Sequence, residues 1–503
     1  MSRHIVIGGG IAGLTAAHRL RAAAPQADVL LLEGAERPGG HVHTMRDGGF
    51  VVEAGPNGFL ARANEPEPMA LVRELGLEGA LIEAQPAAKR RFVWLRGRLR
   101  LAPSSPPSLL STDALSPAGK LRLALEPFVR SRSNAGESVH AFAARRLGRE
   151  AADALVDPAV SGVSAGDSRA LEAAAAFPML VEMEREHGSL LRAMLARRAK
   201  APRLVSFLGG LGTLTEALAR RLGSAVRTRA RVQRLAPVAG GWHVLLDSGE
   251  WLDADAVVIA TSAANAAALL APVDAELSRE LAGFPQAGLG VVAMAFRAAD
   301  LPRLLDGYGF LAARGHGLND TLGVVWESSL FAGRAPAGHV LVRAMLGGAR
   351  RPEVPELDAP SLLERARREL ATAMGVRAMP VRHWVWRWPR AITQYTPGHL
   401  ERVARVRARL AQHPGLELCG TSYDGISFTA AMVSAERAAA RLLELPVAEP
   451  KPEPPRFTSL TLALRRDELP ATPNPVPIPP AITGPPPVST PLARIDRCAD
   501  MSS

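Results

Sequence analysis

The residues whose spacing best indicates chemistry lie near the start of the chain, at Gly8-Gly9-Gly10-Ile11-Ala12-Gly13, and Glu33 follows about twenty residues later. Gly8 permits a sharp turn, Gly10 lets the backbone approach a pyrophosphate, and Gly13 lets a helix pack closely on a strand. An acid at the position of Glu33 accepts hydrogen bonds from the ribose hydroxyls of a nucleotide. The pattern therefore predicts a dinucleotide-binding site.

Three elements must hold these residues in position. The apolar run 4–7 predicts a buried strand, 14–24 predicts an Ala- and Leu-rich helix, and 29–32 predicts a second strand that leads to Glu33. The free N–H groups and the dipole at the start of the helix favour the charge of a phosphate. A glycine-rich turn alone is weak evidence for a dinucleotide-binding site. Here the strand, the helix, the second strand and the acid all follow at the spacing that such a site requires.

Composition limits the partners that we expect. The chain has 503 residues, enough for two or three domains with a sizeable core, and a formal net charge of +11. Such a charge is compatible with nucleic acid, anionic lipid or an anionic small substrate. Because no helix-turn-helix, zinc-finger or RNA-binding signature accompanies the charge, no nucleic acid partner is expected.

Cysteine usage and hydropathy favour a cytoplasmic protein. Cys419 and Cys498 are far apart in the sequence, so we expect no disulfide framework. The glycine-rich turn begins at residue 8, so no signal peptide is expected. No run of about eighteen apolar residues is present, which predicts a protein that is soluble or peripheral on the inner face of the cell membrane.

Two stretches beyond Glu33, at 36–40 and 50–56, favour FAD over NAD. Together with the first forty residues they resemble the flavoprotein amine oxidase and protoporphyrinogen oxidase superfamily, although His41 stands where that family usually has arginine. The resemblance implies a non-covalent FAD. Besides Gly8 to Gly13 and Glu33, the cofactor-binding residues that it implies are Gly39, Gly40, Gly55, Pro56, Asn57, Gly58, Val232, Trp388, Gly420, Ile426, Ser427 and Phe428.

Several later blocks are similar to the protoporphyrinogen oxidase family in particular. They are 87–92, 136–148, 161–167, 177–180 and 386–399, and general amine oxidases and carotenoid desaturases do not share the middle blocks. The similarity extends over roughly residues 3–445. The sequence departs from the family pattern at Thr393 and around 426–428.

The resemblance implies an oxygen-dependent enzyme of haem synthesis. Protoporphyrinogen IX would lose six electrons in three FAD-mediated steps, with dioxygen reduced to hydrogen peroxide. Loss of hydride from a meso carbon is stabilised by the adjacent pyrroles, so no catalytic acid or base is assigned. None of the twelve histidines pairs at metal-ligand spacing, and no metal is expected.

Five residues match the family's substrate site. Arg91 matches the arginine that binds a propionate, with Arg90 as an alternative; Gly162 and Ala165 match the ring pocket; Phe331 and Met345 match apolar walls. Each has a simpler alternative, namely a solvated charge for Arg91, ordinary packing for the two small residues, and plain core for Phe331 and Met345.

Three other functions remain open. Coproporphyrinogen III oxidation to coproporphyrin III would require more cations for four propionates, and the arginine-rich segment 89–100 supplies them. A flavin amine oxidase usually flanks its substrate with two tyrosines, and this chain has three tyrosines in all. A non-catalytic flavin-binding partner of the haem pathway is the third alternative.

We predict an α/β fold, with a Rossmann-like FAD-binding domain assembled from the discontinuous segments 1–85, 205–265 and 385–445. A helical subdomain at 86–204 faces substrate and membrane, and a mixed-sheet substrate domain occupies 266–384 with an antiparallel sheet. The Pro-rich segment 446–503 is predicted to be disordered. Peripheral membrane contact through the basic segment 89–132, hand-off to ferrochelatase and a homodimer are further expectations.

Four local predictions can be compared with the structure. A hairpin is expected over 92–101 with its turn at Gly97, and a single strand over 226–235. Alternating apolar segments between 290 and 348 indicate the antiparallel sheet, and a helix is expected over 430–443.

Overall fold

The structure, a computed structural model, describes residues 2–62, 66–103, 108, 112–130, 132–196 and 202–444. These residues belong to one compact unit of the chain. The predicted disordered segment 446–503 lies outside the described residues and stays a prediction.

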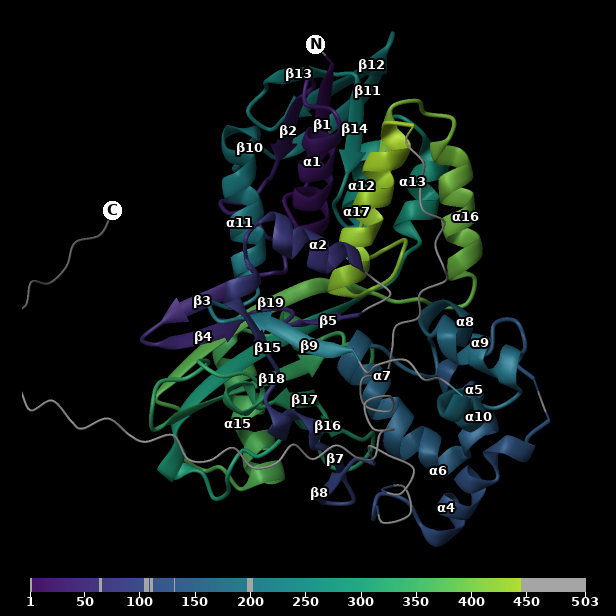
Figure 1. Cartoon of the computed structure of the whole chain (residues 1–503), viewed down its shortest axis with the longest axis vertical. Coiled ribbons are helices and arrows are strands. Elements are labelled where there is room, and N and C mark those ends of the chain that lie inside the picture. Colours follow the sequence, from purple (N-terminus) through teal and green to yellow (C-terminus); the bar gives the residue numbers. More distant parts are fainter. Residues whose placement is uncertain are drawn as a thin grey trace, which may run out of the picture. The chain divides into compact units, whose positions relative to one another are not determined.

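A five-stranded parallel sheet has the order β10-β2-β1-β14-β20 (Figure 1). Its strands are β1 (Arg3–Ile7), β2 (Asp28–Leu32), β10 (Val226–Arg227), β14 (Ala256–Ile259) and β20 (Leu416–Leu418). Because these strands come from three separate segments of the chain, the sheet confirms the predicted Rossmann-like domain of discontinuous segments.

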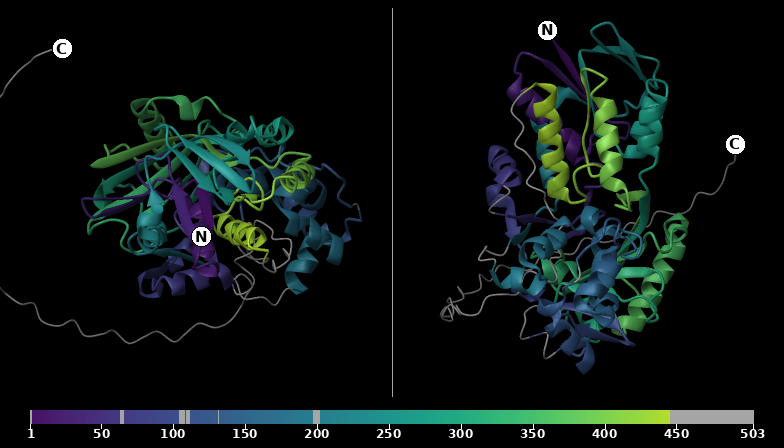
Figure 2. Two further views of the ribbon diagram at one scale, coloured as in Figure 1. Left: turned by 90° about the horizontal axis from the view of Figure 1, so that it is seen from above. Right: turned by 90° about the vertical axis from the view of Figure 1, so that its right-hand side faces the viewer.

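Both faces of this sheet are covered, so alternate residues of a strand pack in opposite directions. Val6 packs with α1 (Ile11–Ala23), α11 (Gly212–Leu222) and α17 (Phe428–Leu442). Ile5 and Ile7 pack with the opposite layer, which contains α12 (Ala263–Leu270), α13 (Ala275–Ala282) and α16 (His399–Leu410). The yellow α17, which begins two residues before the predicted 430, lies beside the purple α1 (Figure 2).

A three-stranded antiparallel sheet follows in the opposite layer, with β11 (Val232–Val238), β12 (Gly241–Leu246) and β13 (Trp251–Ala254). The prediction of one strand over 226–235 is wrong, because residues 226–227 pair with β2 and residues from 232 onward pair with β12. Arg229, with a φ of 52°, turns the chain between the two sheets. The sequence between 226 and 235 reads as one strand, because its apolar pattern does not reveal that its two ends pair with different sheets.

The second large sheet has seven strands in the order β19-β15-β18-β17-β16-β7-β8. They are β7 (Arg91–Leu95), β8 (Arg98–Leu101), β15 (Gln286–Arg297), β16 (Gly309–Ala312), β17 (Thr321–Val325), β18 (His339–Gly347) and β19 (Arg382–Thr393). The antiparallel segments between 290 and 348 are confirmed, and so is the hairpin, whose turn at Gly97 has a φ of 73°. Because β7 pairs in parallel with β16, the sheet is mixed, and it joins two strands of the segment 86–204, expected to be helical, to strands of the segment 266–384.

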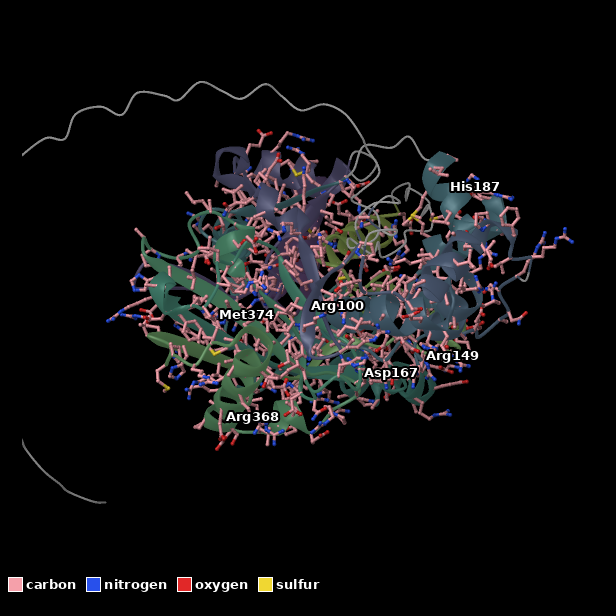
Figure 3. The ribbon with its side chains drawn as sticks, turned by 90° about the horizontal axis from the view of Figure 1, so that it is seen from below. Arg100, Arg149, Asp167, His187, Arg368 and Met374 are labelled. Atoms are coloured by element: carbon pink, nitrogen blue, oxygen red, sulfur yellow. The ribbon has the colours of Figure 1, made fainter. Side chains whose placement is uncertain are left out.

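Alternation along these strands separates two faces. Val292 and Met294 pack with α15 (Ala359–Met374), the helix that carries Arg368 and Met374 in the view from below (Figure 3). Val291, Arg343 and Met345 point to the other face, toward a large cavity. The sheet is therefore the floor on which the functional site is built.

Helices form the third part of the unit. They are α4 (Pro117–Ala124), α5 (Val139–Leu147), α6 (Arg149–Ala151), the π-helix η4 (Ala152–Val156), α7 (Asp157–Ser164), α8 (Ala173–Ala176), α9 (Pro178–His187) and α10 (Leu190–Ala196). Arg149, Asp167 and His187 lie in this part (Figure 3). Glu126, paired with the buried Arg146, also accepts hydrogen bonds from the backbone N–H groups of Leu190 and Leu191 at the start of α10.

Shorter elements connect these parts. They are β3 (Thr44–Asp47), β4 (Phe50–Glu53), β5 (Phe59–Ala61), α2 (Pro66–Glu74), β6 (Leu81–Glu83), β9 (Arg203–Phe207), α14 (Glu327–Leu330), and the 3-10 turns η1 (Glu78–Ala80), η2 (Pro86–Lys89), η3 (Glu126–Phe128), η5 (Gly223–Ala225), η6 (Ala298–Asp300) and η7 (Val354–Glu356). None of the helices in the described part of the chain is both long and apolar enough to cross a bilayer. Membrane contact by the helical part stays a prediction.

Candidate active site

A single cavity of about 1270 Å³ joins the carboxyl ends of the parallel strands to the floor of the seven-stranded sheet. The glycine-rich turn, the loop after β4, helix α7 and the start of α17 all contribute to its walls. Ligands of open α/β sheets bind beyond the carboxyl ends of the strands, so the position of the cavity is that of a dinucleotide site.

The glycine-rich turn has the geometry that its sequence predicts. Gly8 has a φ of 104°, and a Cβ on Gly13 would lie 1.8 Å from the carbonyl oxygen of Gly8, so neither position accepts a side chain. Gly13 itself lies between helix and strand and does not line the cavity. A Cβ on Gly10, by contrast, would meet no atom within 4 Å, because Gly10 opens directly onto the cavity. This open space at the start of α1 fits a diphosphate.

The nucleotide end of the cavity contains one acid and two arginines. Glu33 accepts hydrogen bonds from the backbone N–H groups of Gly9 and Ala35, both at 2.7 Å. Its carboxylate is thereby fixed at the cavity wall, where the expected ribose contact needs it. Arg37 and Arg231 line the same region, and Val232 follows Arg231 at the wall. Positive charge next to an acid suits a nucleotide that combines phosphates with ribose hydroxyls.

Beyond the nucleotide end, backbone rather than side chains lines much of the cavity. Gly39, Gly40 and the loop 55–58 are exposed to it, and a Cβ on Gly420 would meet no atom within 4 Å. Trp388 lines the wall and donates from Nε1 to the carbonyl oxygen of Ala54 at 2.8 Å. A flat ring system can approach such a surface closely.

The start of α17 also faces this region, through Ile426, Ser427 and Phe428. Ser427 caps the helix by accepting a hydrogen bond from the backbone N–H of Ala430 at 3.0 Å. The helix dipole therefore places partial positive charge at the cavity, where it stabilises negative charge on a bound ring.

His41 occupies the position at which the family usually has arginine, and its ring makes an edge contact with Trp388 at 4.9 Å between centroids. Burial lowers the pKa of His41, so the imidazole is neutral at neutral pH. A diphosphate bound beside His41 would have one cation fewer than the family pattern supplies.

A third region of the cavity lies between α7 and the sheet. Arg91, Gly162, Ala165 and Met345 all line the cavity. That they contact substrate stays a prediction. The alternative residue Arg90 is exposed and forms an ion pair with Asp306, so of these two arginines only Arg91 lies at the cavity wall. Gly162 also has a packing role, since a Cβ there would lie 2.3 Å from the Leu311 side chain.

Phe331 does not lie where the sequence suggested. Its side chain is fully buried outside the cavity lining, and its ring would contact a Cβ on Gly58 at 3.1 Å. The helical turn α14 ends just before Phe331 and directs the ring behind the loop 55–58. Phe331 therefore supports the cofactor loop, and the expectation that it touches substrate is corrected.

Comparison with known proteins agrees with this geometry. Residues 11–443 match the family of flavin containing amine oxidoreductases. The chain belongs to this family. It is 31% identical to the chloroplastic protoporphyrinogen oxidase of Nicotiana tabacum over 84% of the chain and 82% of that protein.

Two further relatives narrow the position within the family. The chain is 28% identical to the coproporphyrinogen III oxidase of Bacillus subtilis (strain 168), over 84% of the chain and 94% of that protein. A crystal structure of a proposed protoporphyrinogen oxidase from Exiguobacterium sp. 255-15 has 26% identity and a TM-score of 0.78, and covers 88% of this chain and 99% of that one. The chain is thus an FAD-dependent oxidoreductase that groups with the porphyrinogen-oxidising members of the family.

Three functional candidates were missed at the level of sequence, namely Tyr308, Glu327 and Arg343. Arg343 donates from Nε to Glu327 Oε1 at 2.7 Å, and Asn57 donates from Nδ2 to the same oxygen at 3.3 Å. Arg343 and Tyr308 line the cavity. Strand alternation offers a signal for Arg343, two residues before Met345, whereas nothing local distinguishes Glu327 from a surface acid.

Proposed function

We propose that this enzyme oxidises protoporphyrinogen IX to protoporphyrin IX in three two-electron steps, with dioxygen as the electron acceptor. The observation that carries the proposal is Arg91, a cation on the wall of a largely apolar chamber that opens onto the FAD cradle. Among the described residues no acid forms an ion pair with Arg91. A flat apolar substrate with carboxylates fits a wall of this kind.

When bound, FAD supplies a hydride acceptor that passes its electron pair on to dioxygen. Over the three steps the substrate loses three hydrides from meso carbons and three protons, two of them from pyrrole nitrogens and one from the fourth meso carbon after a tautomeric shift. Three steps consume three molecules of dioxygen and release three of hydrogen peroxide, which balances the six hydrogens that the substrate loses.

The chain's own residues bind, orient and shield. Arg91 holds a propionate, while Gly162 and Ala165 leave space for the macrocycle between α7 and the sheet. Glu33 is the one acid among the described lining residues, and its hydrogen bonds to Gly9 and Ala35 hold it at the nucleotide end. No side chain is assigned as an acid or base, in agreement with a substrate whose pyrroles stabilise the loss of hydride.

Coproporphyrinogen III is the second candidate, favoured by the Bacillus subtilis relative and by Arg62, which also lines the cavity. An amine substrate is disfavoured by the tyrosines. Tyr308 lines the cavity, but Tyr395 and Tyr423 are buried away from it, so the paired tyrosines of an amine site are not formed.

The test is to mix the purified flavoprotein with each porphyrinogen under nitrogen and follow the visible flavin absorption. We expect protoporphyrinogen IX to bleach the flavin, and readmitted air to restore it, with three molecules of dioxygen consumed per porphyrin formed. The FAD-free protein controls for spontaneous oxidation. Faster bleaching by coproporphyrinogen III would establish the second candidate, and bleaching by neither would refute both.

A further inference from the structure

Arg91 has an aromatic ring as its partner. Its guanidinium carbon lies 4.8 Å from the centroid of the Tyr308 ring. The adjacent Arg90 shows the usual alternative, because it forms an exposed ion pair with Asp306. Two consecutive arginines therefore have different partners, and the one at the cavity wall is the one without an acid.

The kind of group beside Arg91 decides whether its guanidinium can bind an anion. A carboxylate beside Arg91 would neutralise the guanidinium and compete with an incoming anion. The face of an aromatic ring attracts and orients a cation through its quadrupole but leaves the cation's charge in place. A guanidinium held in this way remains able to form a bidentate contact with a carboxylate.

The backbone brings the two side chains together. Arg91 and Gly309 are register partners in the parallel pair β7–β16, and the N–H of Tyr308 donates to the carbonyl oxygen of Arg90 at 2.8 Å. Gly309 has a φ of 133°, and a Cβ there would lie 2.0 Å from the carbonyl oxygen of Val324. The residue opposite Arg91 must therefore lack a side chain, because the Val324 backbone occupies the place of a Cβ.

The ring of Tyr308 is itself held by its surroundings. It packs against the buried cluster that contains Val325, Leu330 and Phe331. Burial raises the pKa of the Tyr308 hydroxyl, so the platform stays neutral and does not pair with Arg91 as a phenolate.

We propose that Tyr308 is a positioning residue that fixes Arg91 as an unneutralised cation for a substrate carboxylate. The inference rests on the proposed function, because it requires Arg91 to be the carboxylate anchor.

A first experiment replaces the ring. Tyr308→Leu is expected to raise KM for the porphyrinogen about tenfold, with kcat within about twofold, because the oriented contact of Arg91 is lost. Tyr308→Phe keeps the ring and is expected to recover most of the lost affinity. FAD content and the far-UV spectrum report whether each variant is folded. An unchanged KM in a folded Tyr308→Leu protein would overturn the proposal.

A double-mutant cycle separates positioning from direct contact. If Tyr308 acts through Arg91, Tyr308→Leu adds less than about a twofold change in KM when Arg91 is already alanine. An equal effect of Tyr308→Leu in both backgrounds would mean that the ring contacts substrate directly, and would overturn the proposal.

A binding measurement distinguishes failure of this inference from failure of the proposed function. Wild-type protein should bind protoporphyrin IX more tightly than its dimethyl ester, and Tyr308→Leu should lose most of that preference. A wild-type protein without the preference would overturn both the carboxylate anchor and the positioning role. A preference that Tyr308→Leu retains in full would overturn the positioning role alone.

Discussion

Arg343 donates a hydrogen bond from Nη1 to the carbonyl oxygen of Gly55, with 2.5 Å between the two atoms. Its Nε donates to Glu327, and both side chains are almost fully buried. The pair thus connects the floor of the sheet with the loop 55–58 that faces the cofactor. The buried ion pair of Arg343 and Glu327 therefore also holds the backbone of Gly55 in its place at the cavity.

Arg343→Ala is expected to lower the free energy of unfolding by about 3–5 kcal/mol, because it leaves the buried Glu327 without its cationic partner. FAD affinity should fall as well, since the carbonyl of Gly55 loses its donor. Urea denaturation and FAD titration measure the two effects. The matched control is Arg90→Ala, which removes an exposed ion pair and should cost about 1 kcal/mol or less. Equal losses in both variants would contradict the importance of burial.

Arg91→Ala is expected to cost at least about 2 kcal/mol of substrate binding, or roughly a 30-fold rise in KM. FAD content should stay unchanged, because Arg91 lies in the chamber between α7 and the sheet rather than at the nucleotide end. Steady-state kinetics with each porphyrinogen are the measurement, and Arg90→Ala is again the control. A KM that rises equally in the two variants would show that the overall basic charge matters rather than the position of Arg91.

Gly10→Ala and Gly13→Ala are expected to damage different properties, the first the affinity for FAD and the second the stability of the fold. The Cβ on Gly10 meets only open cavity, so the FAD-free protein should keep its thermal midpoint while FAD affinity falls at least about tenfold. The Cβ on Gly13 would clash with the carbonyl of Gly8, which should cost about 1–3 kcal/mol of stability before any ligand is added. Calorimetry with and without FAD separates the two, and an unchanged FAD affinity in Gly10→Ala would place the diphosphate elsewhere.

His399 is expected to make stability depend on pH. Burial lowers the pKa of His399 from 6.5 to about 4, and the ring stacks on Tyr395 at 3.6 Å. The unfolded chain takes up this proton first, so the contribution is complete above pH 6.5 and declines as the pH falls toward about 4. Between about pH 7.5 and about pH 5, the wild type should lose about 2 kcal/mol more than His399→Phe. Urea denaturation at each pH gives the free energy of unfolding of both proteins. The same pH dependence of that free energy in the wild type and in His399→Phe would contradict this role of His399.

Local spacing was enough to predict the strand, glycine-rich turn and helix at the start of the chain. The glycines at 8, 10 and 13 act on backbone within a few residues of one another, and Glu33 directly follows the next strand, β2. The hairpin over 92–101 and the strands between 290 and 348 were equally accessible, because alternation and turn residues are local signals. The error at 226–235 arose because one apolar run supplies strands to two different sheets.

Only the tertiary structure decided how the chamber is built. Register across β18, β17, β16 and β7 places Arg343 and Arg91 in one transverse row of the floor, through Val325 and Gly309. The partners Tyr308, Asn57 and Glu327 come from distant segments, and no spacing along the chain announces their contacts. Sequence therefore determined the cofactor cradle, since its chemistry depends on consecutive backbone. Strand pairing determined which arginine is neutralised and which remains available, since that depends on neighbours brought together only by folding.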